Sequence, residues 1–140
     1  MTRELVLVGG GGTAADVMLL IDALIQSGEP VKVIGLLDDA LPKGSERFGV
    51  QVLGGLSDAS SFPQAEFVDC LGSPHSFKSR ETLISKLGGA EVSFATLIHP
   101  ATKVPQGTVI GEGSIIYQGV TLLSGVTLGR HVTVLSGCVL

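Results

Sequence analysis

The sequence predicts an α/β domain with a small parallel sheet, followed by a β-solenoid made of hexapeptide repeats. Three observations predict this fold. Short aliphatic runs alternate with helical patterns over residues 1–97, a glycine-rich stretch joins the first run to the first helix, and an aliphatic residue recurs at every sixth position from Ile98 onward. Alternating strands and helices form parallel βαβ units, and a fixed short repeat indicates a solenoid. We therefore expect two domains, residues 1–97 and 98–140.

The composition favours an aliphatic core and excludes several classes of partner. Apolar residues make up 44% of the chain and aromatic residues 4%, which is typical of parallel sheets and solenoids. A net charge of −4 without any run of Lys or Arg argues against nucleic acid or an anionic membrane as partner. The chain has neither a signal-peptide pattern nor a membrane-spanning run, so we expect a cytoplasmic location, with Cys70 and Cys138 as buried thiols.

The first part of the chain contains the strands and helices of about half a dinucleotide-binding fold. The stretch 9–28 has Val17, Leu20, Ile21 and Leu24 at helical spacing, and Gly28 is placed to end that helix. A second helix is expected over 75–89, and residues 50–55 are expected to form a short extended piece in a loop-rich segment. The four strands expected in this part are residues 4–8, 31–39, 66–73 and 91–98. Four strands suit one mononucleotide better than two.

The second part of the chain has a strict period of six. Eight aliphatic residues hold the repeating position: Ile98, Val104, Ile110, Ile116, Leu122, Leu128, Val134 and Leu140. A second set of small or β-branched residues follows four positions later in each hexad, from Thr108 to Cys138, and a third column holds glycine except at His131. Three hexads per turn make a triangular coil whose aliphatic residues point inward and whose glycines turn the corners.

The glycine-rich stretch after the first strand predicts a phosphate-binding loop of the Rossmann-like type. Gly9, Gly11 and Ala14 have the G-x-G-x-x-A spacing between a strand and a helix, where backbone N–H groups can bind phosphate oxygens. A turn without any ligand gives the same pattern. Asp38 and Asp39 end the next strand, where contacts to a ribose or base are expected, although they could equally be a solvated turn or a helix cap.

The sequence positions of the histidines and cysteines indicate neither a catalytic group nor a metal site. We expect His75 to start a helix, His99 to lie at the domain junction, and His131 to be exposed at a solenoid corner, and none of them is assigned as a catalyst. No Cys/His cluster has metal-ligand spacing, so no metal is expected.

The chain resembles a known family over its whole length. The strand–GGGG–helix opening, "GLLDD", "GVQVLGG" and "ATLIHPATKVPQGTVIGEG" leading into hexads resemble the sialic acid O-acetyltransferase and pilin-glycosylation UDP-sugar N-acetyltransferase family. The resemblance implies a left-handed β-helix, a homotrimer, acetyl-CoA as co-substrate and a UDP- or GDP-linked sugar as acceptor. It implies nucleotide contacts from Gly9, Gly10, Gly11, Gly12, Asp38, Asp39, Gly72 and Ser73. Thr13 stands where members often have His.

The resemblance places the family's catalytic histidine beyond Leu140, because "GCVL" aligns with the hexad that precedes it. We therefore expect an acetyltransferase by family, acting on the sugar nitrogen or oxygen in glycan or cell-surface polysaccharide biosynthesis, and we expect residues 1–140 by themselves to be inactive. A non-catalytic nucleotide-sugar-binding module with an oligomerising solenoid stub is the second hypothesis. An NAD-dependent oxidoreductase, which depends on the G-x-G-x-x-A spacing alone, is the third.

Overall fold

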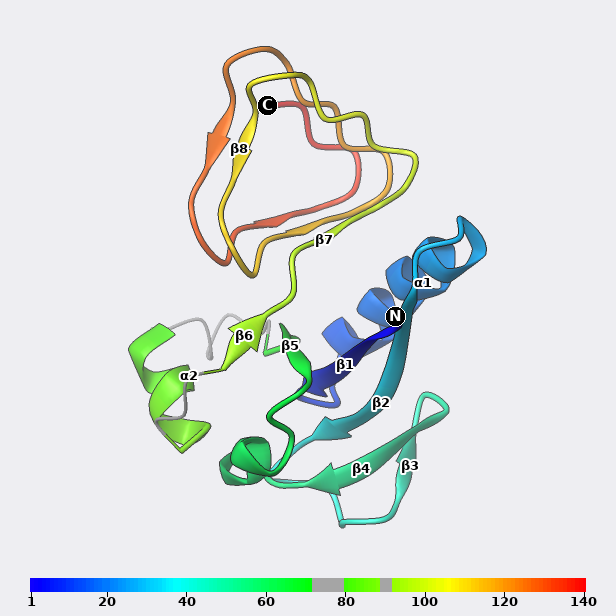
Figure 1. The fold of residues 1–140 in the computed structure, drawn as a ribbon, viewed down its shortest axis with the longest axis vertical. Coiled ribbons are helices and arrows are strands. Elements are labelled where there is room, and N and C mark those ends of the chain that lie inside the picture. Colours follow the sequence, from blue (N-terminus) through cyan, green and yellow to red (C-terminus); the bar gives the residue numbers. More distant parts are fainter. Residues whose placement is uncertain (72–79, 89–91) are drawn as a thin grey trace.

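The first part of the chain folds into a six-stranded, mainly parallel sheet (Figure 1). The structure is a computed structural model that describes residues 1–71, 80–88 and 92–140. The parallel strands are β1 (Arg3–Val8), β2 (Val31–Leu37), β4 (Val50–Gly54), β5 (Glu66–Asp69) and β6 (Ser93–Phe94), and β3 (Glu46–Arg47) pairs antiparallel with β4 at one edge. The order is β3-β4-β2-β1-β5-β6. The chain therefore crosses from one half of the sheet to the other between β4 and β5, with β1 at the centre, which places the ligand-binding crevice of such sheets at the carboxyl end of β1.

Helix α1 (Gly12–Gln26) covers one face of this sheet and connects β1 to β2. Its buried residues have the predicted helical spacing, and they are Ala14, Val17, Leu20, Ile21 and Leu24. Gly28 follows the helix with a φ of +96°, which confirms its predicted role as the C-terminal stop. The 3₁₀ helix η1 (Leu56–Ser61) and α2 (Arg80–Lys86) lie in the connections from β4 to β5 and from β5 to β6.

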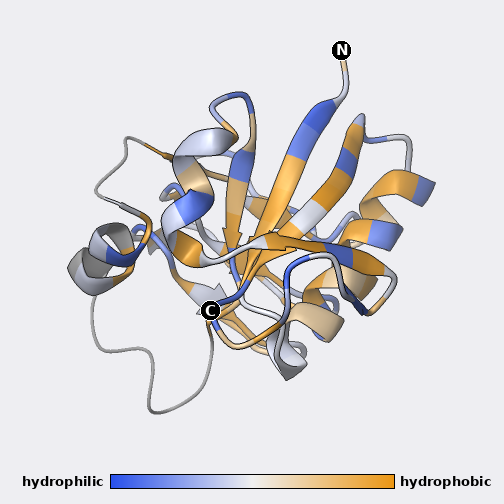
Figure 2. Ribbon diagram, turned by 90° about the horizontal axis from the view of Figure 1, so that it is seen from below, coloured by the Kyte–Doolittle hydropathy of each residue, from blue (hydrophilic) through white to orange (hydrophobic). Residues whose placement is uncertain are grey.

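Alternate residues of β1 fill the two cores on opposite faces of the sheet. Leu5 and Leu7 belong to the cluster under α1, whereas Val6 and Val8 belong to the cluster with Phe67 on the other face. All four β1 side chains are fully buried, as expected for a central parallel strand. Figure 2 shows the same pattern, with hydrophobic strands at the centre and hydrophilic segments at the strand ends and loops.

The second part of the chain forms a three-sided coil, which Figure 1 shows nearly end-on as a triangle. Its strands are β7 (Leu97–Ile98), β8 (Val109–Ile110), β9 (Ile115–Ile116), β10 (Thr127–Leu128) and β11 (Thr133–Val134). Every pairing is parallel and joins residues 18 positions apart, in the stacks β7–β9–β11 and β8–β10 and in the bridge from Thr121 to Val139. The predicted three hexads per turn are confirmed by this register.

The interior and corners of the coil follow the predicted columns. Ile116, Leu122 and Val134 are buried, while Val104 and Leu140 in the outermost coils are 43% and 42% exposed. The five corner glycines have φ between 79° and 86°, and they are Gly107, Gly113, Gly119, Gly125 and Gly137. These left-handed values explain the glycine column, because a side chain there would be strained.

A buried serine ties two neighbouring coils together inside the solenoid. The Ser114 side chain has no exposed surface. Its hydroxyl donates to the carbonyl oxygen of Gly129 at 3.0 Å and accepts from the N–H of Val132 at 3.1 Å. Because both contacts lie one coil away, a buried polar side chain is satisfied and links the coils in register.

Three predicted elements of the first part differ from the structure. The single strand expected over 91–98 is two short strands, β6 and β7, which belong to different sheets because the chain leaves the first sheet after Phe94 and joins the solenoid at Leu97. The extended piece at 50–55 is a full parallel strand, and β3 adds a hairpin partner, so the described sheet has more than the four strands expected. The predicted strand at 66–73 is shorter, ending at Asp69, and α2 is described only over Arg80–Lys86.

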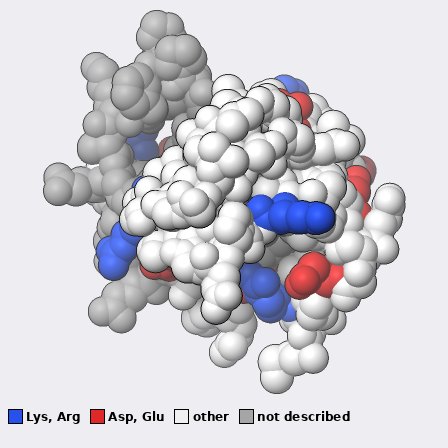
Figure 3. Space-filling view, turned by 90° about the horizontal axis from the view of Figure 1, so that it is seen from above, with Lys and Arg blue, Asp and Glu red and all other residues white. Residues whose placement is uncertain are grey.

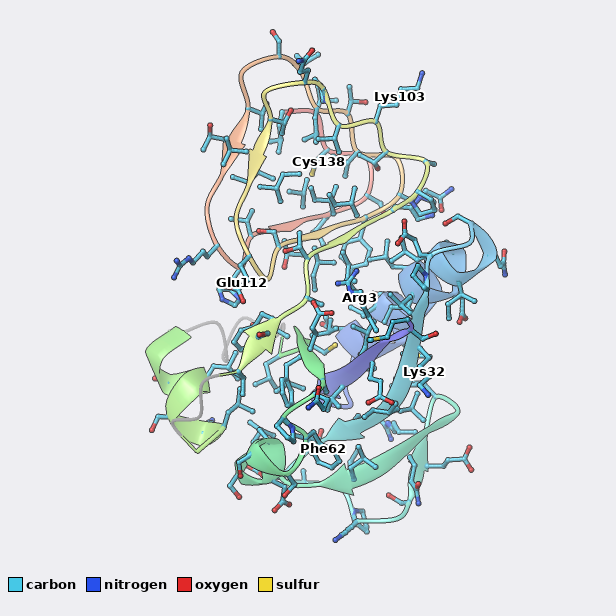
Figure 4. The ribbon with its side chains drawn as sticks, in the orientation of Figure 1. Arg3, Lys32, Phe62, Lys103, Glu112 and Cys138 are labelled. Atoms are coloured by element: carbon cyan, nitrogen blue, oxygen red, sulfur yellow. The ribbon has the colours of Figure 1, made fainter. Side chains whose placement is uncertain are left out.

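The two parts of the chain share one hydrophobic core. Ala95, Leu97 and Ile115 are buried in the same cluster as the apolar residues of α1, and Tyr117 packs against it. A second contact lies at a solenoid corner, where Glu112 Oε1 accepts the N–H of Phe94 at 3.0 Å. Figure 4 shows Glu112 at the edge of the triangle that faces the first part of the chain.

Candidate functional site

The loop after β1 lies against the carboxyl end of β5. Gly9 has a φ of +99°, and a Cβ atom there would come within 2.8 Å of Leu71 Cδ2 and 3.4 Å of the Cys70 carbonyl oxygen. A side chain at this position would therefore be strained in its backbone and would have to displace the end of the Leu71 side chain. Glycine at position 9 lets the loop turn tightly between β1 and β5.

Gly10 is held on both sides by side chains that follow β2 or belong to β3. Its N–H donates to Asp38 Oδ2 at 2.8 Å, and its carbonyl oxygen accepts from Arg47 Nε at 3.0 Å. A Cβ at Gly10 would meet Leu41 Cδ1 at 2.7 Å. The conformation of the loop is thus fixed by an acidic residue after β2 and a basic residue of the β3–β4 hairpin.

Gly11 and Gly12 differ from the two glycines before them, because the fold itself does not require them. A Cβ at either position would have no atom within 4 Å, and neither has a positive φ. Gly11 is the N-cap of α1, where no side chain caps the helix and the first turn has no acidic residue. The first N–H groups of α1 therefore have no cap from a side chain of the described residues, and such groups favour anions.

The aspartates after β2 support the backbone around this loop. Asp38 is half-buried, and its second oxygen, Oδ1, accepts from the N–H of Ala40 at 2.7 Å. Asp39 is exposed, and its Oδ1 accepts from the N–H of Leu56 at 2.9 Å, at the start of η1. The structure thus places Asp38 against the glycine loop and Asp39 against η1, both after the carboxyl end of β2.

Other predicted residues lie elsewhere or outside the described parts. Gly72, Ser73 and His75 are not among the described residues. His99 follows β7, and its Nδ1 accepts from the N–H of Ala101 at 3.0 Å. The prediction that His131 is exposed is wrong, because its ring is half-buried and meets Phe94 edge-on with 4.6 Å between ring centroids.

Two weak acids beneath the site are held in their neutral form by burial. The thiol of Cys70 is buried, which raises its pKa, and the nearby carboxylate of Asp69 raises it further. Burial raises the pKa of Tyr117 to about 12, with smaller electrostatic contributions from the neighbouring Cys70 and Asp16. Cys70 is therefore the core residue predicted, whereas Cys138 is half-buried inside the solenoid (Figure 4).

Sequence reasoning missed Arg47, the basic side chain that contacts the loop. Its guanidinium also lies 5.1 Å from the ring centroid of Phe48. The sequence signal was weak, since a lone arginine in a loop-rich segment normally indicates an exposed turn. Within the described ranges, three or more His, Cys, Asp or Glu residues do not cluster as a metal site, and no described helix could span a membrane.

Both parts of the chain are similar to known proteins. Residues 107–140 match the description "Bacterial transferase hexapeptide (six repeats)". This stretch carries the hexapeptide repeat. Comparison with curated protein sequences gives no significant match.

Solved acetyltransferase structures match the whole chain. The acetyltransferase domain of PglB from Neisseria gonorrhoeae in complex with acetyl coenzyme A is 24% identical, with a TM-score of 0.78, and covers 100% of this chain and 65% of its own. PerB from Caulobacter crescentus in complex with CoA and GDP-perosamine is 24% identical with a TM-score of 0.78, covering 100% and 63%. A mutant of perosamine N-acetyltransferase from the same organism, with the same ligands, is 25% identical with a TM-score of 0.76, covering 100% and 63%.

The chain has the fold of these acetyltransferases and spans just under two thirds of their length, between 63% and 65%. The likeness extends across the α/β part and the solenoid, because the whole chain is covered in each comparison. The hexapeptide match lies wholly within the three-sided coil described above.

Proposed function

We propose that the protein is an acetyl-CoA-dependent acetyltransferase that acts on a nucleotide-linked sugar, in glycan or cell-surface polysaccharide biosynthesis. The observation that carries this proposal is the pair of glycines, Gly11 and Gly12, that face open space at the N-terminus of α1 without being required by the fold. The full-length likeness to a perosamine N-acetyltransferase bound to CoA and GDP-perosamine, together with the hexapeptide repeat, supports the same function.

The nucleotide sugar is assigned to the carboxyl edge of the sheet. Its diphosphate lies on the N–H groups of Gly11 and Gly12, with Gly9 and Gly10 shaping the turn beneath it. Both carboxylate oxygens of Asp38 accept backbone N–H groups, whereas Asp39 has one oxygen in such a hydrogen bond. We therefore assign Asp39 to the nucleoside, where it would accept from a ribose hydroxyl or from a hydroxyl or amine of the base. Gly72 and Ser73 complete the proposed binding residues. The nucleotide is UDP or GDP.

The reaction is a direct acyl transfer. The amine or hydroxyl of the sugar attacks the thioester carbonyl of acetyl-CoA, a general base takes the proton of the attacking group, and CoA leaves as the thiolate. Backbone N–H groups are suited to stabilise the oxyanion formed in between. The base is not assigned to a residue of the described ranges, because the two histidines there, His99 and His131, lie in the contacts described above.

The solenoid is proposed to be a left-handed β-helix that forms a homotrimer and binds acetyl-CoA between neighbouring copies, in a cytoplasmic protein. Its outer surface supports association, since Leu123, Leu135 and Val139 are 57%, 63% and 65% exposed. Figure 3 shows the solenoid side of the molecule as mostly uncharged, with isolated charged side chains. Size-exclusion chromatography with light scattering tests the trimer, and a stable monomer would contradict it.

Isothermal titration calorimetry with UDP, GDP and their sugars tests the acceptor site. We expect binding, and we expect Gly11→Ala to weaken it by about tenfold or more, because the added methyl group projects into the ligand space. The cost to stability should be about 1 kcal/mol or less, since Ala is a poorer N-cap than Gly. Gly129→Ala, in the solenoid, is the matched control and keeps its affinity, because Gly129 also faces open space and has no positive φ. Equal affinities of wild type and Gly11→Ala would refute the assignment of the diphosphate to this loop.

A non-catalytic nucleotide-sugar-binding module is the second candidate. It is favoured by one observation, namely that neither described histidine lies at the glycine loop. Release of the CoA thiol from acetyl-CoA in the presence of a UDP- or GDP-linked amino sugar separates the two functions. Sugar-dependent release supports the acetyltransferase, and nucleotide-sugar binding without any release supports the module.

A further inference from the structure

The β3–β4 hairpin brings Arg47 to the glycine loop through a strained two-residue turn. Arg47 pairs with Val50 across the turn, and the two residues between them, Phe48 and Gly49, have φ of 54° and 75°. Two consecutive positive φ values are typical of a type I′ hairpin turn, in which Asn or Gly is the usual first residue. A phenylalanine there is strained, because in the left-handed region its Cβ comes too close to the following carbonyl oxygen.

The strained phenylalanine supports the arginine. The Arg47 guanidinium carbon lies 5.1 Å from the centroid of the Phe48 ring, which is 43% exposed. A cation over an aromatic face is attracted by the ring electrons, and the contact restricts the long arginine side chain. The position of Phe48 is thus explained by its effect on Arg47 rather than by burial in a core.

Arg47 determines which way the peptide between Gly10 and Gly11 faces. The Gly10 carbonyl oxygen accepts from Arg47 Nε, and the structure contains no cis peptide bond among the described residues. In a trans peptide the C=O and N–H point in opposite directions. The N–H of Gly11 therefore points away from Arg47.

Arg47 also balances a negative charge at the same loop residue. The carboxylate of Asp38 accepts the N–H of Gly10, and an unbalanced carboxylate there would repel an incoming anion. The basic side chains of the described ion pairs, Arg3 and Lys32, pair with Glu66 and Glu4 at the strand beginnings. Arg47 is the basic residue of the described parts that forms a hydrogen bond to the loop.

We propose that Arg47 is the positioning residue for the diphosphate of the nucleotide sugar, holding the Gly10–Gly11 peptide in its anion-accepting orientation and supplying the positive charge that offsets Asp38. Phe48 holds Arg47 in place. This inference rests on the proposed function, because it assumes that a nucleoside diphosphate binds at the glycine loop.

Calorimetry with the whole chain and four simple probes tests the inference. The probes are UDP, GDP and the corresponding nucleosides, uridine and guanosine, which lack phosphate. We expect Arg47→Gln to weaken binding of the diphosphates by about tenfold or more, as for other charge-assisted hydrogen bonds, and to leave nucleoside binding unchanged. Arg47→Lys keeps the charge and recovers part of the loss. Lys43→Gln removes the same charge from the same β2–β4 connection without contacting the loop, and it serves as the control.

A substitution at Phe48 tests whether the hairpin acts by positioning Arg47 or only by stabilising the fold. Asn tolerates a positive φ, so Phe48→Asn relieves strain, and the thermal midpoint of unfolding is expected to stay the same or rise. The same change removes the ring beneath Arg47, so diphosphate affinity is expected to fall severalfold while nucleoside affinity is unchanged. A purely structural role for this hairpin would make stability and affinity change in the same direction.

The outcomes distinguish this inference from the proposed function. If wild type binds UDP or GDP and Arg47→Gln binds it as tightly, or loses nucleoside affinity to the same extent, the role of Arg47 is refuted and the proposed function stands. If wild type binds no nucleoside diphosphate, the nucleotide-sugar site itself is refuted.

Discussion

At the scale of single residues, the four consecutive glycines serve two different purposes. Gly9 is required by the fold because of its φ of +99°, and a Cβ at Gly9 or Gly10 would also press on the end of Leu71 or Leu41. Gly11 and Gly12 have open space and ordinary backbone angles, so their lack of a side chain benefits a ligand rather than the protein. The glycine-rich motif is therefore partly structural and partly a candidate for phosphate binding.

Substituting Gly9 with alanine tests the structural half of this division. We expect Gly9→Ala to lower the free energy of unfolding by roughly 2–4 kcal/mol, because it combines the strain of a positive φ with overlap at Leu71. Gly28→Ala is the matched control, since its φ of +96° is similar but its surroundings are open, and only the strain remains. Urea denaturation measures both, and equal losses would mean that Leu71 moves aside freely.

Predictions for single residues succeeded where the hexapeptide repeat defined the position. They failed where the position depends on a contact with a residue far away in the sequence. The glycine column predicted a left-handed corner at position 131, and His131 has a φ of 56° there. Its contact with Phe94 could not be read from the repeat, because Phe94 belongs to another sheet. Arg47 and Gly10 are 37 residues apart, and no local pattern links them.

At the scale of elements, the period of six was a stronger signal than strand propensity. The solenoid strands are two residues long, so no propensity window could find them, yet the period predicted their register of 18 residues. The sheet was harder to predict, because residues 91–98 read as one apolar strand although the chain changes sheets between Phe94 and Leu97. The strand β3 has only exposed polar residues, Glu46 and Arg47, and gave no hydrophobic signal.

The stacking of corners between coils leads to a prediction for the solenoid. Gly113 and Gly125 share a φ of +80°, but a Cβ at Gly113 would overlap the His131 ring on the next coil, whereas Gly125 faces open space. We expect Gly125→Ala to cost about 1–2 kcal/mol of stability from backbone strain alone. Gly113→Ala should cost roughly 1–3 kcal/mol more, because Phe94 restricts the His131 ring.

Thermal and urea unfolding of the two corner variants measure the difference. A second substitution, His131→Gly in the Gly113→Ala background, removes the overlapping ring and should recover much of the excess loss. If Gly113→Ala and Gly125→Ala have the same stability, the His131 ring does not lie over the Gly113 corner.

At the scale of the whole molecule, one core joins the two parts of the chain. The apolar face of α1 packs against Leu97 and Ile115 of the solenoid, and the corner residue Glu112 binds the backbone of Phe94. Helix α1 is thus fixed against the solenoid by packing rather than by a flexible linker. This arrangement suits a reaction whose acceptor is bound by one part and whose acetyl donor is proposed to be bound by the other.

Tyr117 reports on this junction, because it is the only tyrosine in the chain. It packs against the core under α1, and burial, Cys70 and Asp16 raise its pKa to about 12. Absorbance at the tyrosinate band during an alkaline titration is therefore expected to show one transition near that value in the folded protein, and near the ordinary value of 10.0 in urea. A folded-state transition near 10.0 would mean that the ring is solvated and that the two parts do not pack as described.

The same shift predicts how stability depends on alkaline pH. Between pH 10.0 and about 12 the unfolded chain releases the Tyr117 proton while the folded protein retains it. Folding stability should therefore fall as the pH rises through this window, and this contribution should be constant below it. Tyr117→Phe removes the titrating hydroxyl but keeps the ring, so its urea midpoint should fall less steeply over the same window than that of wild type. Parallel pH profiles for the two proteins would show that burial of this hydroxyl does not couple the solenoid to α1.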